Sequence, residues 1–327
     1  MSRVVFIKPD FYNSFKCIAG DCSDSCCIGW EIAVDEKTKA KYKKMNDAFG
    51  EKIMANLTTD EDGFTCFKLS DNERCPFLNE KKLCDIIINK GEEFLCDICT
   101  EHPRFYNEFP LAVECGLGLC CEAVCRLLLE NEAPFELESE PAFEEELLFD
   151  EALCEDYTVL LEIREAIFNI LKGDEAYSEK LEEIITKLEA AGENVRIDSA
   201  DKIIASYEKT EPINEEWVEY FCELQKNANE ILQKEKPFDE ATNGDKLYSK
   251  ILSYVIFRHL GSCLYNESSS LGECLSFCIS AVRFIKLCDM KTYHEKGTLT
   301  LSDRIENVKR WSKQIEYSDL NVDMLTK

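Results

Sequence analysis

The chain has 327 residues, a net charge of −27, 19 cysteines and three histidines. Because 45% of its residues are hydrophobic, it can bury a sizeable core, which excludes a disordered acidic tail. Residues 1–130 have 16 Lys and Arg against 23 Asp and Glu, and the remainder has 22 against 42. Nucleic-acid binding needs a basic face, so nucleic acid is excluded as a partner.

The sequence predicts neither a membrane protein nor an exported one. Its longest apolar run is far shorter than the ~18 residues that a membrane-spanning helix needs. The N-terminal string MSRVVFIKPDFYNSF lacks the apolar region and the small-residue cleavage site of a secretory signal. We therefore expect a cytoplasmic protein. Cysteines in that reducing compartment rarely form disulfides, so a dense group of thiols indicates a metal or an iron–sulfur cluster.

Residues 1–130 hold 13 of the 19 cysteines and are predicted to form an irregular metal-binding domain with short elements. A helix is expected from an Asp35 cap to Leu57, and a short strand over 64–69. A second helix is expected over 116–132, where it would carry three cysteines.

Residues 127–163 contain no Lys or Arg but 13 Asp and Glu. This composition predicts a solvated linker or an exposed helix face, and we place an acidic connector at 131–150. The alternative is an acidic surface that attracts a basic partner segment.

Hydrophobic residues recur at helical spacing throughout 151–327, which predicts a helical bundle. The expected fold is therefore mainly α. An irregular, cysteine-rich N-terminal metal domain with minor β structure packs on a C-terminal helical bundle.

Eleven of the 13 cysteines in the first 130 residues fall into four groups. Short spacings let one loop supply several ligands at little entropic cost, and thiolates select zinc, copper(I) or iron–sulfur clusters. Neither a complete zinc ribbon nor a ferredoxin spacing is present, so the spacing leaves zinc and iron–sulfur open. With three histidines available, the site must consist mainly of sulfur. The groups are Cys17, Cys22, Cys26 and Cys27; Cys75 and Cys84; Cys96 and Cys99; and Cys120, Cys121 and Cys125.

The six later cysteines each replace an apolar residue on a predicted helix face. A buried cysteine acts as a small hydrophobe, so we expect these residues to fill the core. They are Cys154, Cys222, Cys263, Cys274, Cys278 and Cys288.

The string KPDFYNSFKCIAGDCSDSCCIGWEIAVD, residues 8–35, resembles the N-terminus of the flagellin lysine-N-methylase family. It resembles more loosely the broader family of zinc- or iron-chelating cysteine-cluster proteins. The strings CPFLNEKKLCDI (75–86) and FLCDICTEHPRF (94–105) match in order and approximate spacing. The segment YVIFRHL (254–260) resembles the C-terminal helix of that family, which contains Tyr and Arg.

The resemblance implies methyl transfer from S-adenosylmethionine to lysines of flagellin, with an associated iron–sulfur cluster of the [4Fe–4S] type. Zinc is the alternative metal. Because one cubane needs four ligands, the nine thiols that match by position include bystanders or serve a second metal. We rank Cys22, Cys26, Cys27 and Cys99 first. The nine are Cys17, Cys22, Cys26, Cys27, Cys75, Cys84, Cys96, Cys99 and Cys120, whereas Cys115, Cys121 and Cys125 look like local extras.

Further residues are candidates for cofactor binding and for accepting the proton of the lysine. Arg104, within the third cysteine group, is a candidate to bind the carboxylate of the cofactor, with a surface ion pair as the alternative.

Methylation requires the lysine to lose a proton, and we assign no base. The string 111–119 partly resembles the acidic-x-Gly-x-Gly turn of Rossmann-type methyltransferases, but a Gly pair that opens a helix is the preferred interpretation. Candidate bases are Tyr106, Glu114, Glu122 and Tyr254.

Two other functions compete with methyl transfer. One is a non-catalytic protein that chelates zinc or iron through the same cysteines. The other is a scaffold whose acidic helical half docks a partner.

Overall fold

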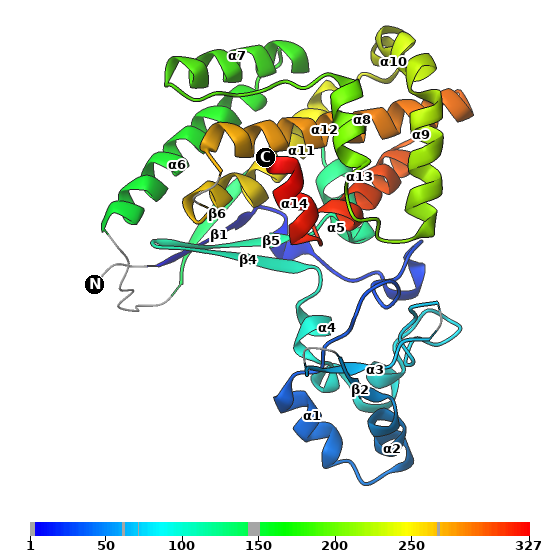
Figure 1. The fold of residues 1–327 in the computed structure, drawn as a ribbon. Coiled ribbons are helices and arrows are strands. Elements are labelled where there is room, and N and C mark those ends of the chain that lie inside the picture. Colours follow the sequence, from blue (N-terminus) through cyan, green and yellow to red (C-terminus); the bar gives the residue numbers. More distant parts are fainter. Residues whose placement is uncertain (1–3, 61–62, 71, 143–150, 267–268) are drawn as a thin grey trace. The chain divides into compact units, whose positions relative to one another are not determined.

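The structure is a computed structural model, and it describes residues 4–60, 63–70, 72–142, 151–266 and 269–327. It is mainly α with a small amount of sheet (Figure 1). This confirms the predicted fold class, including the irregular cysteine-rich region.

The chain divides into two compact units, which we call the helical unit and the cysteine unit. The predicted boundaries at residues 130 and 150 do not coincide with this division, because strands from the first 120 residues belong to the helical unit. That unit comprises 1–15, 106–120 and 124–327, and the cysteine unit comprises 16–105 and 121–123.

A four-stranded sheet has the strand order β4-β5-β1-β6. Strand β1 runs parallel to β5, with Ile7 opposite Glu114, and antiparallel to β6, with Ile7 opposite Ser139. The sheet therefore joins segments that are more than 100 residues apart in sequence. The strands are β1 (Val5–Pro9), β4 (Arg104–Phe109), β5 (Ala112–Leu117) and β6 (Leu137–Pro141).

The sheet corrects two predictions. Part of the predicted acidic connector is the edge strand β6, a position that tolerates the charged residues and the proline of Leu137–Pro141. Residues 143–150 of that connector lie outside the described residues. The helix predicted over 116–132 begins only at Glu122, as α5 (Glu122–Glu130), because residues up to Leu117 extend in β5. Pairing with β1 there outweighs the local helical pattern.

Nine helices from α6 to α14 follow in the described part of the helical unit, in the region where hydrophobic spacing predicts a helical bundle (Figure 1). The central helix α12 contacts α8 to α11, α13 and α14. It begins with a capping box in which Ser270 and Glu273 satisfy each other's backbone N–H groups. The helices are α6 (Glu151–Leu171), α7 (Tyr177–Ala190), α8 (Ala200–Tyr207), α9 (Glu215–Gln233), α10 (Glu235–Thr242), α11 (Asp245–His259), α12 (Leu271–Lys296), α13 (Leu301–Ile315) and α14 (Asp319–Thr326).

No helix among the residues that the structure describes combines the length and the apolar character needed to cross a membrane.

The cysteine unit is built from short elements around an aromatic core. Tyr42, Phe67 and Phe77 are buried there, and the rings of Phe67 and Phe77 meet edge to face at 5.0 Å between centroids. The elements are α1 (Glu36–Lys43), α2 (Ala48–Ala55), β2 (Leu57–Thr59), β3 (Thr65–Phe67), α3 (Asp85–Lys90) and α4 (Asp97–Glu101).

The helix predicted over 35–57 consists of α1 and α2. Asp35 caps the first, as predicted, by accepting a hydrogen bond from the Thr38 amide at 2.8 Å. Asp47 caps the second by accepting one from the Gly50 amide at 2.8 Å. The second cap divides the periodic stretch into two helices.

A buried ion pair fixes helix α6 to the sheet. The Glu114 carboxylate of β5 accepts a hydrogen bond from Arg164 Nη2 of α6 at 2.7 Å and one from the Tyr157 hydroxyl at 3.0 Å. The side chains of Glu114 and Arg164 are 0% and 3% exposed. Removing one partner of such a pair leaves an uncompensated buried charge, which is costly.

We therefore expect Arg164→Leu to lower the free energy of unfolding by about 3–5 kcal/mol. The matched control is Lys187→Gln, which breaks the exposed pair between Lys187 and Glu183 on α7 and should cost at most about 1 kcal/mol. Urea unfolding followed by circular dichroism measures both values. Equal losses for the two variants would contradict the role given to the buried pair.

Candidate metal centre

Five thiols lie in or against the core of the cysteine unit, and we call them the inner group. Cys75 and Cys96 are part of the buried core, and the other three pack against it. Two of the five occupy the N-cap positions of α3 and α4. The inner group consists of Cys27, Cys75, Cys84, Cys96 and Cys99.

Backbone contacts bring these distant cysteines together. The Cys75 amide donates a hydrogen bond to the Cys27 carbonyl at 2.8 Å, and Leu78 forms an isolated bridge with Cys84. Within α4, Cys96 Sγ and Cys99 Sγ are 3.4 Å apart. Segments separated by more than 40 residues thus present sulfur atoms to one another.

The electrostatics of the inner group favour a bound cation. Burial, together with smaller contributions from negative charge on Cys27, Cys84 and Cys96, raises the pKa of the Cys75 thiol to about 12. The pKa of Cys99 is raised first by its hydrogen bond to Cys96 and then by burial. Thiolates are the form that binds metal, so a positive centre would stabilise the deprotonated group.

Cys27 differs from Cys75, Cys84 and Cys99 in that its pKa is lowered, as is that of Cys96 through its hydrogen bond with Cys99. The Cys26 thiol donates a hydrogen bond to Cys27, which lowers the pKa of Cys27 to about 7 and raises that of Cys26. Hydrogen bonding by Ser25 and the positive charge of Arg74 contribute to this lowering of the Cys27 pKa. Cys27 is therefore a thiol of the inner group that ionises near neutral pH.

Four more thiols form an outer group in the same unit. Negative charge on Cys17 and Cys121 raises the pKa of Cys26, so the three interact. Cys22 Sγ donates to Glu122 Oε2 at 3.6 Å, and the Ser23 amide donates to the same oxygen at 2.7 Å. The outer group consists of Cys17, Cys22, Cys26 and Cys121.

Sequence reasoning treated Cys121 as a local extra, although the structure places it in the outer group. Its position directly after Cys120, a predicted metal ligand, was the sequence feature that could have indicated this. Cys120 itself belongs to the helical unit, where it is buried. Burial raises the pKa of the Tyr317 hydroxyl, and a hydrogen bond to Cys120 contributes.

The four candidate bases have different surroundings. Glu114 is committed to the ion pair with Arg164, and Glu122 accepts hydrogen bonds from the Ser23 segment. Tyr254 is fully buried, and burial with the nearby Glu316 carboxylate raises the pKa of its hydroxyl, so it stays protonated at neutral pH. Tyr106 is 47% exposed. No base is assigned from these positions.

Arg104 begins β4, and its guanidinium donates to the Thr100 carbonyl at 3.3 Å. Its role in binding a cofactor stays a prediction.

The prediction for the six later cysteines is partly wrong. Cys274, Cys278 and Cys288 are buried on α12, as expected of core residues. Cys222 is exposed on α9, whereas Cys154 and Cys263 are half-buried. Where polar residues lie on both sides of a cysteine in a predicted helix, the sequence does not indicate whether that cysteine is on the buried or the exposed face.

The spacing of the inner sulfurs bears on the kind of metal. Within the described ranges, the sole group of three or more ligand atoms that lie within 4.8 Å of one another is formed by Glu31, Asp60 and Cys66. No three of the described inner thiols meet that limit, although Cys96 Sγ and Cys99 Sγ are 3.4 Å apart. One zinc ion with Zn–S bonds of about 2.3 Å holds four sulfurs about 3.8 Å apart, and a four-iron cluster spaces its thiolates farther apart. The sulfur spacing alone therefore does not choose between zinc and an iron–sulfur cluster.

Comparisons with known proteins point to one family. A family model described as the FliB lysine N-methylase C-terminal domain matches residues 142–327. The flagellar biosynthetic protein FliU of Salmonella muenchen is 29% identical over 142 residues, which cover 40% of this chain and 80% of that protein. The lysine-N-methylases of Salmonella choleraesuis and Salmonella typhimurium are 27% and 29% identical over 40% of this chain. The matched segment spans 34% of each lysine-N-methylase. No solved structure matches the chain.

The difference between the pKa of Cys27 and that of Cys75 predicts that the two thiols are alkylated at different rates near neutral pH. In metal-free protein, alkylation of Cys27 by iodoacetamide should rise with pH around a midpoint near 7, because the thiolate is the nucleophile. Cys75, with a pKa of about 12, should react slowly across the same range. Peptide mass spectrometry of timed reactions measures both.

The Cys26→Ala variant tests the cause. It removes the hydrogen-bond donor, so the midpoint for Cys27 should move up toward the ordinary value near 9. A midpoint that is the same in both proteins would contradict the assignment.

Proposed function

The chain belongs to the FliB lysine N-methylase family, and from this we propose that it is a protein-lysine N-methyltransferase that uses S-adenosylmethionine. The match of the family model to residues 142–327 carries the proposal, and two relatives named lysine-N-methylase support it. We propose flagellin as the substrate, because the name of FliU links that relative to flagellar biosynthesis. The reaction is placed in the cytoplasm, where thiols stay reduced.

In the proposed reaction, the neutral lysine amine attacks the methyl carbon of S-adenosylmethionine. The bond from that carbon to sulfur breaks, its electron pair stays on sulfur, and S-adenosylhomocysteine leaves. The proton of the amine passes to a base or to water. This chemistry needs in-line positioning and exclusion of solvent, which a folded cofactor site provides.

We further propose that the inner group holds an iron–sulfur cluster of the [4Fe–4S] type. Its donor set is entirely sulfur, and cysteine thiolates are the ligands that hold iron–sulfur clusters. Four of the five inner thiols would be the ligands. Cys27 and Cys99 are also in the set ranked first from sequence, whereas Cys22 and Cys26 lie in the outer group. Such a cluster, when bound, supplies iron centres with tunable redox potential.

The alternative is a non-catalytic protein that chelates zinc or iron. The same thiols support it, so only an assay of transfer separates the two functions.

The first test is transfer of a labelled methyl group. Protein purified without oxygen should transfer label from S-adenosylmethionine to lysines of flagellin, as read by tryptic mass spectrometry. Flagellin whose lysines have been acetylated is the control and should stay unlabelled. Absence of label on native flagellin, with the iron content of the protein intact, would contradict catalysis and favour the chelating protein.

The second test removes a predicted ligand. Cys96→Ala should lose iron and the absorption near 400 nm, because a buried ligand of the inner group is gone. Cys278→Ala is the matched control, since Cys278 is also a buried thiol but lies on α12, outside the inner group. If both variants keep the iron content of the unmodified chain, the inner group is not the metal site.

A further inference from the structure

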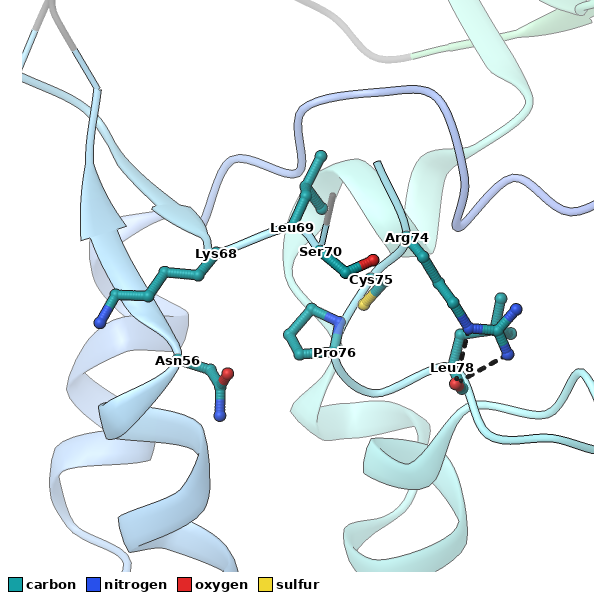
Figure 2. A pocket seen from close by; sticks show the side chains of 8 residues that line it. All are labelled: Asn56, Lys68, Leu69, Ser70, Arg74, Cys75, Pro76 and Leu78. Carbon is teal, nitrogen blue, oxygen red and sulfur yellow. Dashed lines mark hydrogen bonds between the residues drawn. The ribbon is translucent and has the colours of Figure 1, made fainter. Parts of the chain in front are cut away.

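Arg74 lines a cavity of about 430 Å³ in the cysteine unit, beside Cys75 of the inner group (Figure 2). Resting on the iron–sulfur cluster of the proposed function, we propose that Arg74 is a positioning residue of the metal centre. Its fixed positive charge raises the reduction potential of the cluster held by the inner thiols. Arg74 is not a ligand, and it acts on the cluster through its charge.

The backbone places Arg74 between two cysteines of the inner group. It directly precedes Cys75, and it forms an isolated antiparallel bridge with Ile28, the residue that follows Cys27. The Cys75 amide donates a hydrogen bond to the Cys27 carbonyl at 2.8 Å in the same pairing. Arg74 therefore sits next to two thiols that come from segments far apart in sequence.

The side chain of Arg74 is held at a third segment of the inner group. Its guanidinium Nη2 donates to the carbonyl oxygens of Leu78 at 3.0 Å and of Asn79 at 2.7 Å, and Leu78 forms an isolated bridge with Cys84. Figure 2 shows the Arg74 side chain extending to Leu78. Because the guanidinium is fixed in advance, its charge needs no reorganisation when the charge of the metal centre changes.

Arg74 is opposite in sign to other charges near the inner thiols. Burial raises the pKa of Cys84, and the negative charge of Asp85 contributes. The pKa of Cys27 is lowered, first by hydrogen bonding and also by the positive charge of Arg74, so that charge reaches the inner group. Within the part of the chain that the structure describes, the Arg74 guanidinium bonds to carbonyl oxygens and pairs with no carboxylate.

The sign of the effect follows from the charge that reduction adds. One electron from a donor such as dithionite makes the metal centre more negative by one charge, and no bond forms or breaks. A nearby cation interacts more favourably with the more negative form. Arg74 therefore favours the reduced form and allows a weaker electron donor to reduce the centre. Net charge is among the factors that set the potential of iron–sulfur clusters.

The same cavity supplies a matched control. Lys68 also lines it, but its side chain extends to the other side, away from Arg74 (Figure 2). The Lys68 ammonium donates to the Ala55 carbonyl at 3.0 Å, and Lys68 is exposed. Water screens the charge of an exposed group, so loss of the Lys68 charge should affect the metal centre less.

An anaerobic redox titration with dithionite tests the proposal on the full chain, with its iron content measured. Electron paramagnetic resonance reports the reduced cluster. Arg74→Gln should shift the equilibrium toward the oxidised form by about tenfold, which lowers the potential by about 59 mV for one electron. Arg74→Lys keeps the charge and should shift the equilibrium less, as should Lys68→Gln.

A second variant covers the case in which Arg74→Gln holds no iron. The Ser70 amide donates to the Arg74 carbonyl at 3.0 Å, and Ser70 is an exposed residue of the cavity wall. Ser70→Glu adds a negative charge beside Arg74 without removing the bonds of its guanidinium. This variant should therefore also lower the potential, whereas the uncharged control Ser70→Gln should not.

Three outcomes would overturn the proposal. They are an unchanged potential in Arg74→Gln, or in Ser70→Glu where that variant replaces it; equal shifts in Arg74→Gln and Lys68→Gln; and equal shifts in Arg74→Gln and Arg74→Lys. In each of these cases a cluster is still observed, so the proposed function survives. If the unmodified chain shows no iron–sulfur signal at all, the proposed cluster and the role of Arg74 both fail.

Discussion

The organisation of the cysteine unit depends on the electrostatic cost of gathering thiols in an apolar core. Burial raises the pKa of Cys75 and Cys84, and each thiolate raises the pKa of its neighbours. A metal centre would replace several protons by one positive charge and would link segments distant in sequence. A unit of short helices and one small hairpin gains much from such a link, because its apolar core is limited.

The helical unit uses another solution for several of its buried carboxylates, which pair with side chains on neighbouring elements. Asp289 of α12 accepts hydrogen bonds from the Tyr248 hydroxyl at 2.9 Å and from Asn307 Nδ2 at 2.8 Å. The Glu316 carboxylate pairs with Arg258 and His259 of α11. Such pairs fix how helices meet, since breaking one leaves a charge without compensation. In the domain that matches the family model, buried ion pairs and hydrogen bonds therefore join neighbouring helices.

Sequence predicted those features that arise from local patterns. Hydrophobic spacing indicated that 151–327 is helical, although it did not locate the longest helix, α12. Asp35 was recognised as a cap, but its second bond, from the Asp97 amide at 3.0 Å, could not be foreseen. Strand β6 was missed because its partner β1 lies about 130 residues away. The cysteine pattern indicated a thiolate site, but the division into inner and outer groups depends on contacts such as that between Cys75 and Cys27.

The central claim is that the inner thiols hold a cluster of several iron atoms. Iron-edge X-ray absorption on protein purified without oxygen tests it most directly. We expect the spectrum to show an iron–sulfur shell together with an iron–iron shell, and we expect the Cys96→Ala variant to lose both. A metal surrounded by sulfur alone, without a second metal shell, would contradict it and would favour a mononuclear zinc or iron site.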